Sequence, residues 1–149
     1  MATPKRKVAK PQLPMQRQFA FAEQGRIYNL RAIFNKLNAK YFRNKLRGYT
    51  VTWARRRKQR PRGSIVFGTI QEEDRIIRIH PLLDRAMVPQ WFLEYVMYHE
   101  MLHAMVPDRV DGAGRRIIHH EEFYEKERKF HWFRRAKLWE QENLARFLR

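Results

Sequence analysis

The most apolar stretch of the chain runs from Trp91 to Val106 and reads WFLEYVMYHEMLHAMV. Hydrophobic side chains would lie on nearly every side of a helix formed by this stretch, which is typical of a helix enclosed by the rest of a domain. Pro89 suits the first turn of such a helix, and Pro107 prevents its continuation. The pattern therefore predicts a buried central helix over Trp91–Val106.

Apolar residues at helical spacing predict three further helices. The first covers residues 25–44, and its apolar positions are Ile27, Leu30, Ile33, Phe34, Leu37 and Tyr41. The second begins near His119 and carries Phe123, Tyr124 and Phe130. The third covers residues 132–148, and the side chains that would face the core are Phe133, Ala136, Trp139, Leu144, Phe147 and Leu148.

Three shorter apolar segments lie between the first helix and the central one. Residues 49–54 alternate apolar with small polar side chains, as in a half-buried strand. Residues 64–70 and 75–80 form two more apolar runs, and the polar stretch 71–74 between them suits a hairpin. After the central helix, two glycines predict a flexible loop over 108–116. The order of elements predicts an α+β domain with an N-terminal helix, a small three-stranded sheet, a central helix and C-terminal helices.

At 149 residues the chain suits one domain. Pro, Lys and Gln dominate residues 1–22, which we expect to form a basic, disordered arm before a domain over 23–149. The absence of cysteine excludes disulfides, iron–sulfur clusters, thiolate metal sites and a cysteine nucleophile. Because neither a secretory signal nor an apolar stretch of membrane-spanning length is visible, we expect a cytoplasmic protein without a membrane partner, and a monomer.

Charge is the second unusual property. The chain has 32 Lys and Arg residues against 15 Asp and Glu residues, which leaves a formal net charge of +17. Such a surface attracts polyanions, so we expect DNA or RNA as a partner and association with a nucleoid. The alternative is a basic surface that has no specific partner.

The densest basic cluster spans residues 55–62. Its candidate nucleic-acid contacts are Arg55, Arg56, Arg57, Lys58, Arg60 and Arg62. Trp53 or Phe67 would be the aromatic side chain near this cluster that could stack on a base. Arg134 and Arg135 form a shorter cluster near the C-terminus.

The central helix contains the pentad His99-Glu100-Met101-Leu102-His103. Residues four apart lie on one face of a helix with Cβ atoms roughly 6 Å apart, so both imidazoles can bind one metal ion. Glu100 would lie beside that ion, where its carboxylate can take a proton from a water that the metal activates. The alternative is a pair of core histidines that are merely hydrogen-bonded. The pentad on an apolar helix favours a zinc-dependent hydrolase, and a peptidase in particular.

A catalytic zinc usually has three protein ligands and one position open for water. The candidates for the third ligand follow the predicted loop and are His119, His120, Glu121 and Glu122. A carboxylate in this place would make the site gluzincin-like. His80 and His131 are less favoured, because one ends a predicted strand and the other lies among charged residues.

Further short motifs accompany the pentad in a definite order. They are FNKLNAKYF at 34–42, Val51–Trp53, Ile76–Ile79 followed by Pro81-Leu82-Leu83, and HHEEF at 119–123. Together with the pentad they cover about residues 30–135, and their order resembles that of the SprT-like metallopeptidases. This family includes the Spartan-type proteases that act on proteins crosslinked to DNA. Only the pentad is highly specific among these motifs.

The resemblance implies a zincin-like fold, one Zn²⁺ per chain and unstructured protein or peptide segments as substrates. The closing motif of the family is similar to His-Gly-x-x-Phe. With Phe123 as its last residue, the third zinc ligand falls on His119, and His120 stands at the glycine position. The cysteine zinc ribbon of many relatives has no counterpart in this chain.

We therefore expect a zinc-dependent endopeptidase. Its metal ligands and general base would be His99, His103, His119 and Glu100. Candidate donors to the oxyanion of the transition state are Tyr124, Arg115 and Arg116. The alternatives are a DNA- or RNA-binding module with a structural metal site, and a latent peptidase whose arm or last helix covers the cleft.

Overall fold

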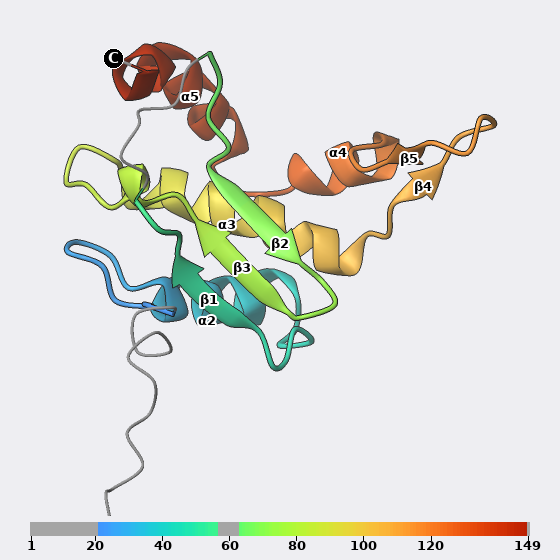
Figure 1. The fold of residues 1–149 in the computed structure, drawn as a ribbon, viewed down its shortest axis with the longest axis horizontal. Coiled ribbons are helices and arrows are strands. Elements are labelled where there is room, and N and C mark those ends of the chain that lie inside the picture. Colours follow the sequence, from blue (N-terminus) through green and yellow to red (C-terminus); the bar gives the residue numbers. More distant parts are fainter. Residues whose placement is uncertain (1–20, 57–62, 149) are drawn as a thin grey trace, which may run out of the picture.

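The computed structural model describes residues 21–56 and 63–148. Its elements in chain order are α2 (Leu30–Tyr41), β1 (Thr50–Trp53), β2 (Gly68–Gln71), β3 (Ile76–Ile79), the 3₁₀ helix η1 (Pro81–Leu83), α3 (Gln90–Met105), β4 (Arg109–Val110), β5 (Arg116–Ile117), α4 (Glu121–Glu127) and α5 (Phe133–Leu148). The fold class is α+β, as the hydrophobic pattern predicts (Figure 1). Most of the expected arm lies outside the described residues.

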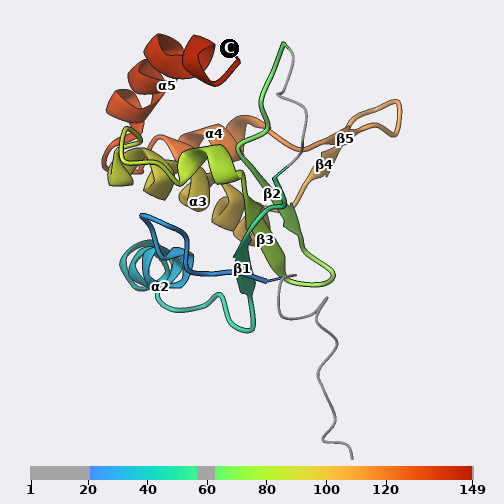
Figure 2. The same ribbon diagram turned by 60° about the vertical axis from the view of Figure 1, so that its left-hand side comes forward.

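Three strands form a small mixed sheet in the order β1-β3-β2. β1 and β3 are parallel, with Val51 opposite Ile77, and β2 is antiparallel to β3, with Ile70 opposite the same residue. The β2–β3 hairpin confirms the predicted one, although β2 begins only at Gly68. Both α2 and α3 lie on one face of the sheet (Figure 2). Among the described residues β2 pairs on one side only, so it is an edge strand.

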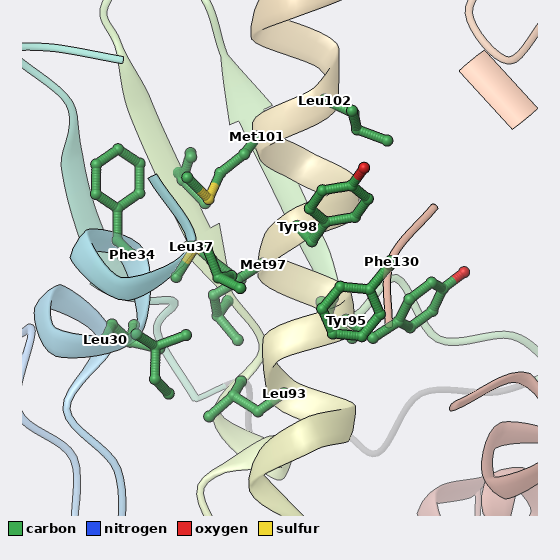
Figure 3. Close-up of a cluster of buried hydrophobic side chains, with 14 of the residues drawn as sticks. Leu30, Phe34, Leu37, Leu93, Tyr95, Met97, Tyr98, Met101, Leu102 and Phe130 are labelled. Carbon is green, nitrogen blue, oxygen red and sulfur yellow. The ribbon is translucent and has the colours of Figure 1, made fainter. Parts of the chain in front are cut away.

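The central helix α3 confirms the predicted buried helix, and it contacts α2, α4, α5 and the sheet. Met97 and Met101 lie on the side of α3 toward Leu37 of α2, whereas Tyr95 and Tyr98 lie on the other side (Figure 3). All five side chains are buried. Burial on both sides explains why α3 has apolar residues all around and no single hydrophobic stripe.

The first helix is shorter than predicted at its N-terminal end. α2 begins at Leu30, because the side chain of Asn29 caps the helix by accepting the Ala32 N–H at 2.9 Å. The preceding backbone is instead held by the buried carboxylate of Asp84, which accepts the N–H groups of residues 26, 27 and 28 at 2.6, 2.9 and 3.1 Å. A Cβ at Gly25 would lie 2.3 Å from Asp84 Oδ2, so this close approach requires glycine. Ile27, expected in the core, is exposed.

The C-terminal end of this helix also differs from the prediction. α2 ends at Tyr41, and Arg43 and Asn44 adopt positive φ angles of 50° and 58°, which no α-helix accommodates. The Asn38 side chain then holds the returning chain by donating to the Leu46 carbonyl at 2.8 Å. Ala22, at the end of the expected arm, donates to Thr52 Oγ1 of β1 at 2.7 Å.

The segment after α3 is more ordered than the predicted flexible loop. β4 and β5 pair antiparallel, and this two-stranded hairpin projects from the body of the domain (Figures 1 and 2). The Asp111 carboxylate closes its turn by accepting the N–H groups of Ala113 and Arg115, each at 2.9 Å. A local side-chain-to-backbone interaction of this kind has no hydrophobic period, and the search for apolar runs therefore missed the hairpin.

The two C-terminal helices confirm the predicted ones with smaller corrections. α4 covers Glu121–Glu127, so Phe130, which the pattern predicts on this helix, lies beyond its end, and Tyr124 on it is exposed. On α5 the side chains of Ala136 and Phe147 are buried, whereas those of Leu144 and Leu148 are only half-buried. Over residues 21–56 and 63–148, none of the helices combines the length and the apolar character that crossing a membrane requires.

Candidate metal centre

Three imidazoles meet beside the C-terminal half of α3. His99 and His103 are one helical turn apart, and the turn between β5 and α4 brings His119 against them. The Nε2 atom of His119 lies 3.1 Å from Nε2 of His99 and 3.1 Å from Nε2 of His103. The ligand atoms of the three residues all lie within 4.8 Å of one another, close enough to bind one metal ion.

The orientation of His99 is set by a carboxylate from the neighbouring helix. Nδ1 of His99 lies 2.6 Å from Oε2 of Glu127 at the end of α4, and Tyr95 donates to Oε1 of the same carboxylate at 3.2 Å. Burial raises the pKa of Glu127, but the hydrogen bond and charge of His99 outweigh it and bring the pKa below its usual value. The ionised Glu127 holds Nδ1 of His99 on its outer side, so that Nε2 of the ring is directed at His119.

The other two imidazoles are held in their neutral form. Burial, and after it the charges of His99 and His119, lowers the pKa of His103 to about 4. Burial and the charge of His99 also lower the pKa of His119. A neutral imidazole is the form that binds a metal ion, so the environment favours the ligating state near neutral pH.

Glu100 lies on the side of α3 that faces the edge strand β2. Its side chain is only 7% exposed, and burial raises its pKa to about 7 although the charge of His99 opposes this. A Cβ on Gly68 would lie 2.9 Å from Cγ of Glu100, so the first residue of β2 leaves room for this carboxylate only as glycine. A general base operates best with a pKa near the working pH.

The other candidates for the third ligand lie outside this cluster. His120 is buried, and its Nε2 lies 2.9 Å from the Pro107 carbonyl oxygen. Glu121 is exposed on α4, and Glu122 forms ion pairs with Arg109 at 3.2 Å and Lys126 at 3.5 Å. The geometry therefore brings His119 to the two pentad histidines and leaves the other three candidates outside the cluster.

The two remaining histidines are also away from the cluster. Nδ1 of His80 accepts the Leu82 N–H at 3.1 Å and so caps η1. His131 is exposed, with its ring centroid 4.5 Å from that of Trp132. Both observations agree with the lower weight that sequence reasoning gives to these residues.

The candidate oxyanion donors differ in where they point. Arg115 pairs with Asp111 at 3.2 Å and Arg116 pairs with Asp108, so both guanidinium groups are bound to acids of the hairpin. Tyr124 is 46% exposed, and its ring centroid lies 6.2 Å from that of His119. Of the three, only Tyr124 has a ring contact with one of the three clustered histidines.

The predicted nucleic-acid contacts are described only in part. Arg55 and Arg56 are exposed just after β1. The other four residues, Arg57, Lys58, Arg60 and Arg62, lie outside the described residues. Both aromatic candidates are half-buried against the core: Trp53 packs on the core cluster, and the Phe67 ring contacts Phe92 and Phe147 with centroids 5.6 Å apart in each case.

Sequence reasoning missed Glu127, Tyr95 and Gly68. One signal could have revealed Glu127, since it follows the buried Phe123 by four residues and so lies on the same inward face of α4. A carboxylate on that face of a helix that packs against α3 requires a partner. The contribution of Gly68 depends on how β2 lies against α3, which no local pattern indicates.

Comparisons of the chain with protein-family models, with curated proteins and with solved structures found no match.

Proposed function

We propose that this protein is a zinc-dependent endopeptidase of the SprT-like type. The observation that carries the proposal is that three imidazole nitrogens converge beside a buried carboxylate. Two of the imidazoles and the carboxylate belong to α3, and the third imidazole precedes α4. His99, His103 and His119 supply the nitrogens, and Glu100 supplies the carboxylate. The order HExxH followed by a more distant histidine is the pattern of a zincin.

The donor set fits zinc. Tetrahedral coordination at 2.0–2.1 Å places nitrogen ligands about 3.3 Å apart, and two of the Nε2 pairs are separated by 3.1 Å. A site with three neutral nitrogen donors suits Zn²⁺ better than Mg²⁺ or Ca²⁺, which prefer oxygen. Glu127 behind His99 supplies the carboxylate–histidine pair that accompanies metal-binding imidazoles.

A catalytic role is favoured over a structural one by what the remaining residues do. A structural zinc has four protein ligands, but within the described part of the chain the cluster contains three. His120, the nearest candidate for a fourth, faces the Pro107 carbonyl. The ring contacts of α5 with α3 involve Trp91, Phe92 and Tyr95, which precede the pentad, so these contacts leave the pentad uncovered.

Each residue then has a definite task. Zinc, when bound, supplies a Lewis acid that polarises the scissile carbonyl and makes water more acidic. Glu100 accepts a proton from the attacking water on a carboxylate oxygen and passes it to the leaving amine. Tyr124, whose ring contacts that of His119, would donate its hydroxyl proton in a hydrogen bond to the carbonyl oxygen as that oxygen gains charge.

Extended protein segments are the substrates that the edge strand favours. The outer edge of β2 is unpaired among the described residues, and its first residue approaches Glu100. A peptide added to this edge would form backbone hydrogen bonds with β2 and pass the catalytic carboxylate. This mode of binding requires an unfolded stretch of substrate and little side-chain specificity.

Replacing Glu100 with Gln tests the proposal most directly. Loss of the general base should lower the rate of casein cleavage by at least about 100-fold, while zinc content stays at one per chain. The matched control is Glu121→Gln, which removes an exposed carboxylate close to the site. Full activity of Glu100→Gln would contradict the role of Glu100 as the general base. Failure of the wild-type protein to bind zinc would contradict the proposal that it is a zinc enzyme. An unchanged DNA affinity in Glu100→Gln, combined with no cleavage by the wild type, would favour the nucleic-acid-binding module.

A further inference from the structure

We infer that the connection between α4 and α5 is a binding site for single-stranded nucleic acid, separate from both the metal centre and the basic cluster at 55–62. The connection lines a half-open hollow of about 380 Å³. Its lining consists of residue 128 and residues 130–135, and includes three arginines and no acidic residue.

The three arginines are available to an anion. Arg128, Arg134 and Arg135 are exposed. Within the described residues, no carboxylate lies within ion-pair distance of any of these guanidinium groups. This sets them apart from Arg115 and Arg116 of the hairpin, which are paired with aspartates. Guanidinium groups without acidic partners match the phosphates of a nucleic-acid backbone.

The same place has an aromatic surface. Trp132 is 37% exposed, and the guanidinium carbon of Arg135 lies 5.4 Å from its ring centroid and 4.6 Å from that of Trp91. These two rings hold the Arg135 guanidinium in one orientation. Arg135 lies over the indole and the His131 ring packs against it with centroids 4.5 Å apart, so the part of Trp132 that stays exposed is the platform on which an unpaired base can stack.

The combination of unpaired arginines with an exposed indole favours single-stranded nucleic acid over other polyanions. A duplex keeps its bases stacked inside, so it could use the arginines but not Trp132. A simple polyanion such as heparin has no bases and would gain nothing from the indole. The formal net charge of +17 draws any of these partners to the surface, and the hollow beside Trp132 distinguishes among them.

Binding of a fluorescent oligothymidylate to the full chain, followed by anisotropy over a range of salt concentrations, tests this site. Trp132→Ala should weaken binding by about 5- to 100-fold, and Trp132→Phe should restore most of the loss. Arg128→Gln combined with Arg134→Gln should reduce the slope of log affinity against log salt by up to about 1.4, since each phosphate contact on a single strand contributes about 0.7.

Matched controls remove two guanidinium groups or one aromatic ring at exposed positions away from the hollow. Arg85→Gln combined with Arg146→Gln lowers the net charge equally at two exposed positions, and Phe21→Ala removes another exposed aromatic ring. Both controls should bind nearly as the wild type does, and circular dichroism should confirm that every variant is folded. Equal losses in the control and test doubles would overturn the proposal. So would a Trp132→Ala protein that binds the oligonucleotide normally, or equal effects of Trp132→Ala on oligothymidylate and heparin.

Discussion

The two sides of α3 are both buried, but they are built from different kinds of interaction. On the side toward α2 and the sheet, Leu93, Met97 and Met101 form apolar contacts with many neighbours (Figure 3). On the side toward α4, His99 depends on one carboxylate, Glu127, for its orientation. Apolar contacts are not directional, so many neighbours together stabilise each apolar side chain. The hydrogen bond that orients the His99 imidazole is directional and has one partner that no neighbour can replace. We therefore expect damage to the first side to appear as lost stability, and damage to the second as lost metal binding.

The largest expected effect is on the apolar side. Met97 is fully buried, so Met97→Ala should lower the free energy of unfolding by about 2–5 kcal/mol through lost contacts and the cavity left behind. Urea denaturation of the zinc-free protein measures this loss. Leu138→Ala, at an exposed position of α5, should cost less than about 0.5 kcal/mol. Zinc affinity of folded Met97→Ala should equal that of the wild type, and a large drop in it would show that the two sides of α3 are not independent.

Removal of the metal should lower the stability of the protein by the amount that zinc binding at the second side contributes. Zinc at 100 times its dissociation constant should stabilise the wild-type protein by about 2.7 kcal/mol, because only the folded state holds the three imidazoles together. A chelator should abolish this gain, as seen in the midpoint of thermal unfolding. His119→Ala should unfold at the same temperature with and without zinc, and close to the chelated wild type. Equal stabilisation of His119→Ala by zinc would place the third ligand elsewhere.

The next effect concerns the residue behind His99. Glu127→Gln keeps the shape of the side chain but removes the charge that holds the Nδ1 proton, so zinc affinity should fall by about 10- to 100-fold. Competition with a chromophoric zinc chelator measures this change. Glu125→Gln removes an exposed carboxylate from the same helix and should leave the affinity within about 2-fold of the wild type. An unaltered affinity in Glu127→Gln would mean that the carboxylate only stabilises the packing of α4.

This contrast also explains how much could be predicted from the sequence. The buried central helix, the β2–β3 hairpin and the two clustered histidines of the pentad have local signals: all-round apolar character, two apolar runs around a polar turn, and two histidines four residues apart. The entry to α2 and the β4–β5 hairpin lack such signals, because Asp84 and Asp111 stabilise them through hydrogen bonds to the backbone. A carboxylate looks the same in the sequence whether it caps a distant loop or faces solvent.

The candidate site divides in the same way. Spacing alone was sufficient to place His99 and His103 together, and the resemblance to a known motif singled out His119 from four candidates. The roles of Glu127 and Gly68 depend on how α4 and β2 pack against α3, which is a property of the tertiary structure. For Gly68 nothing in the surrounding residues indicates it, and for Glu127 the one local signal is its spacing of four residues from the buried Phe123.

The smallest expected effect comes from two tyrosines on α3 that both donate to α4. Tyr95 donates to Glu127, whereas Tyr98 donates to the Lys126 carbonyl oxygen at 2.7 Å. Tyr95→Phe and Tyr98→Phe each remove one hydroxyl, and each should lower the free energy of unfolding by about 1 kcal/mol. Only Tyr95→Phe should also weaken zinc binding, by a few-fold, because its hydroxyl helps to fix the carboxylate that orients His99. Titration of both variants with zinc, alongside urea denaturation, separates the two roles. If Tyr98→Phe weakened zinc binding as much as Tyr95→Phe did, the position of α4 as a whole, and not the single hydrogen bond to Glu127, would control the metal centre.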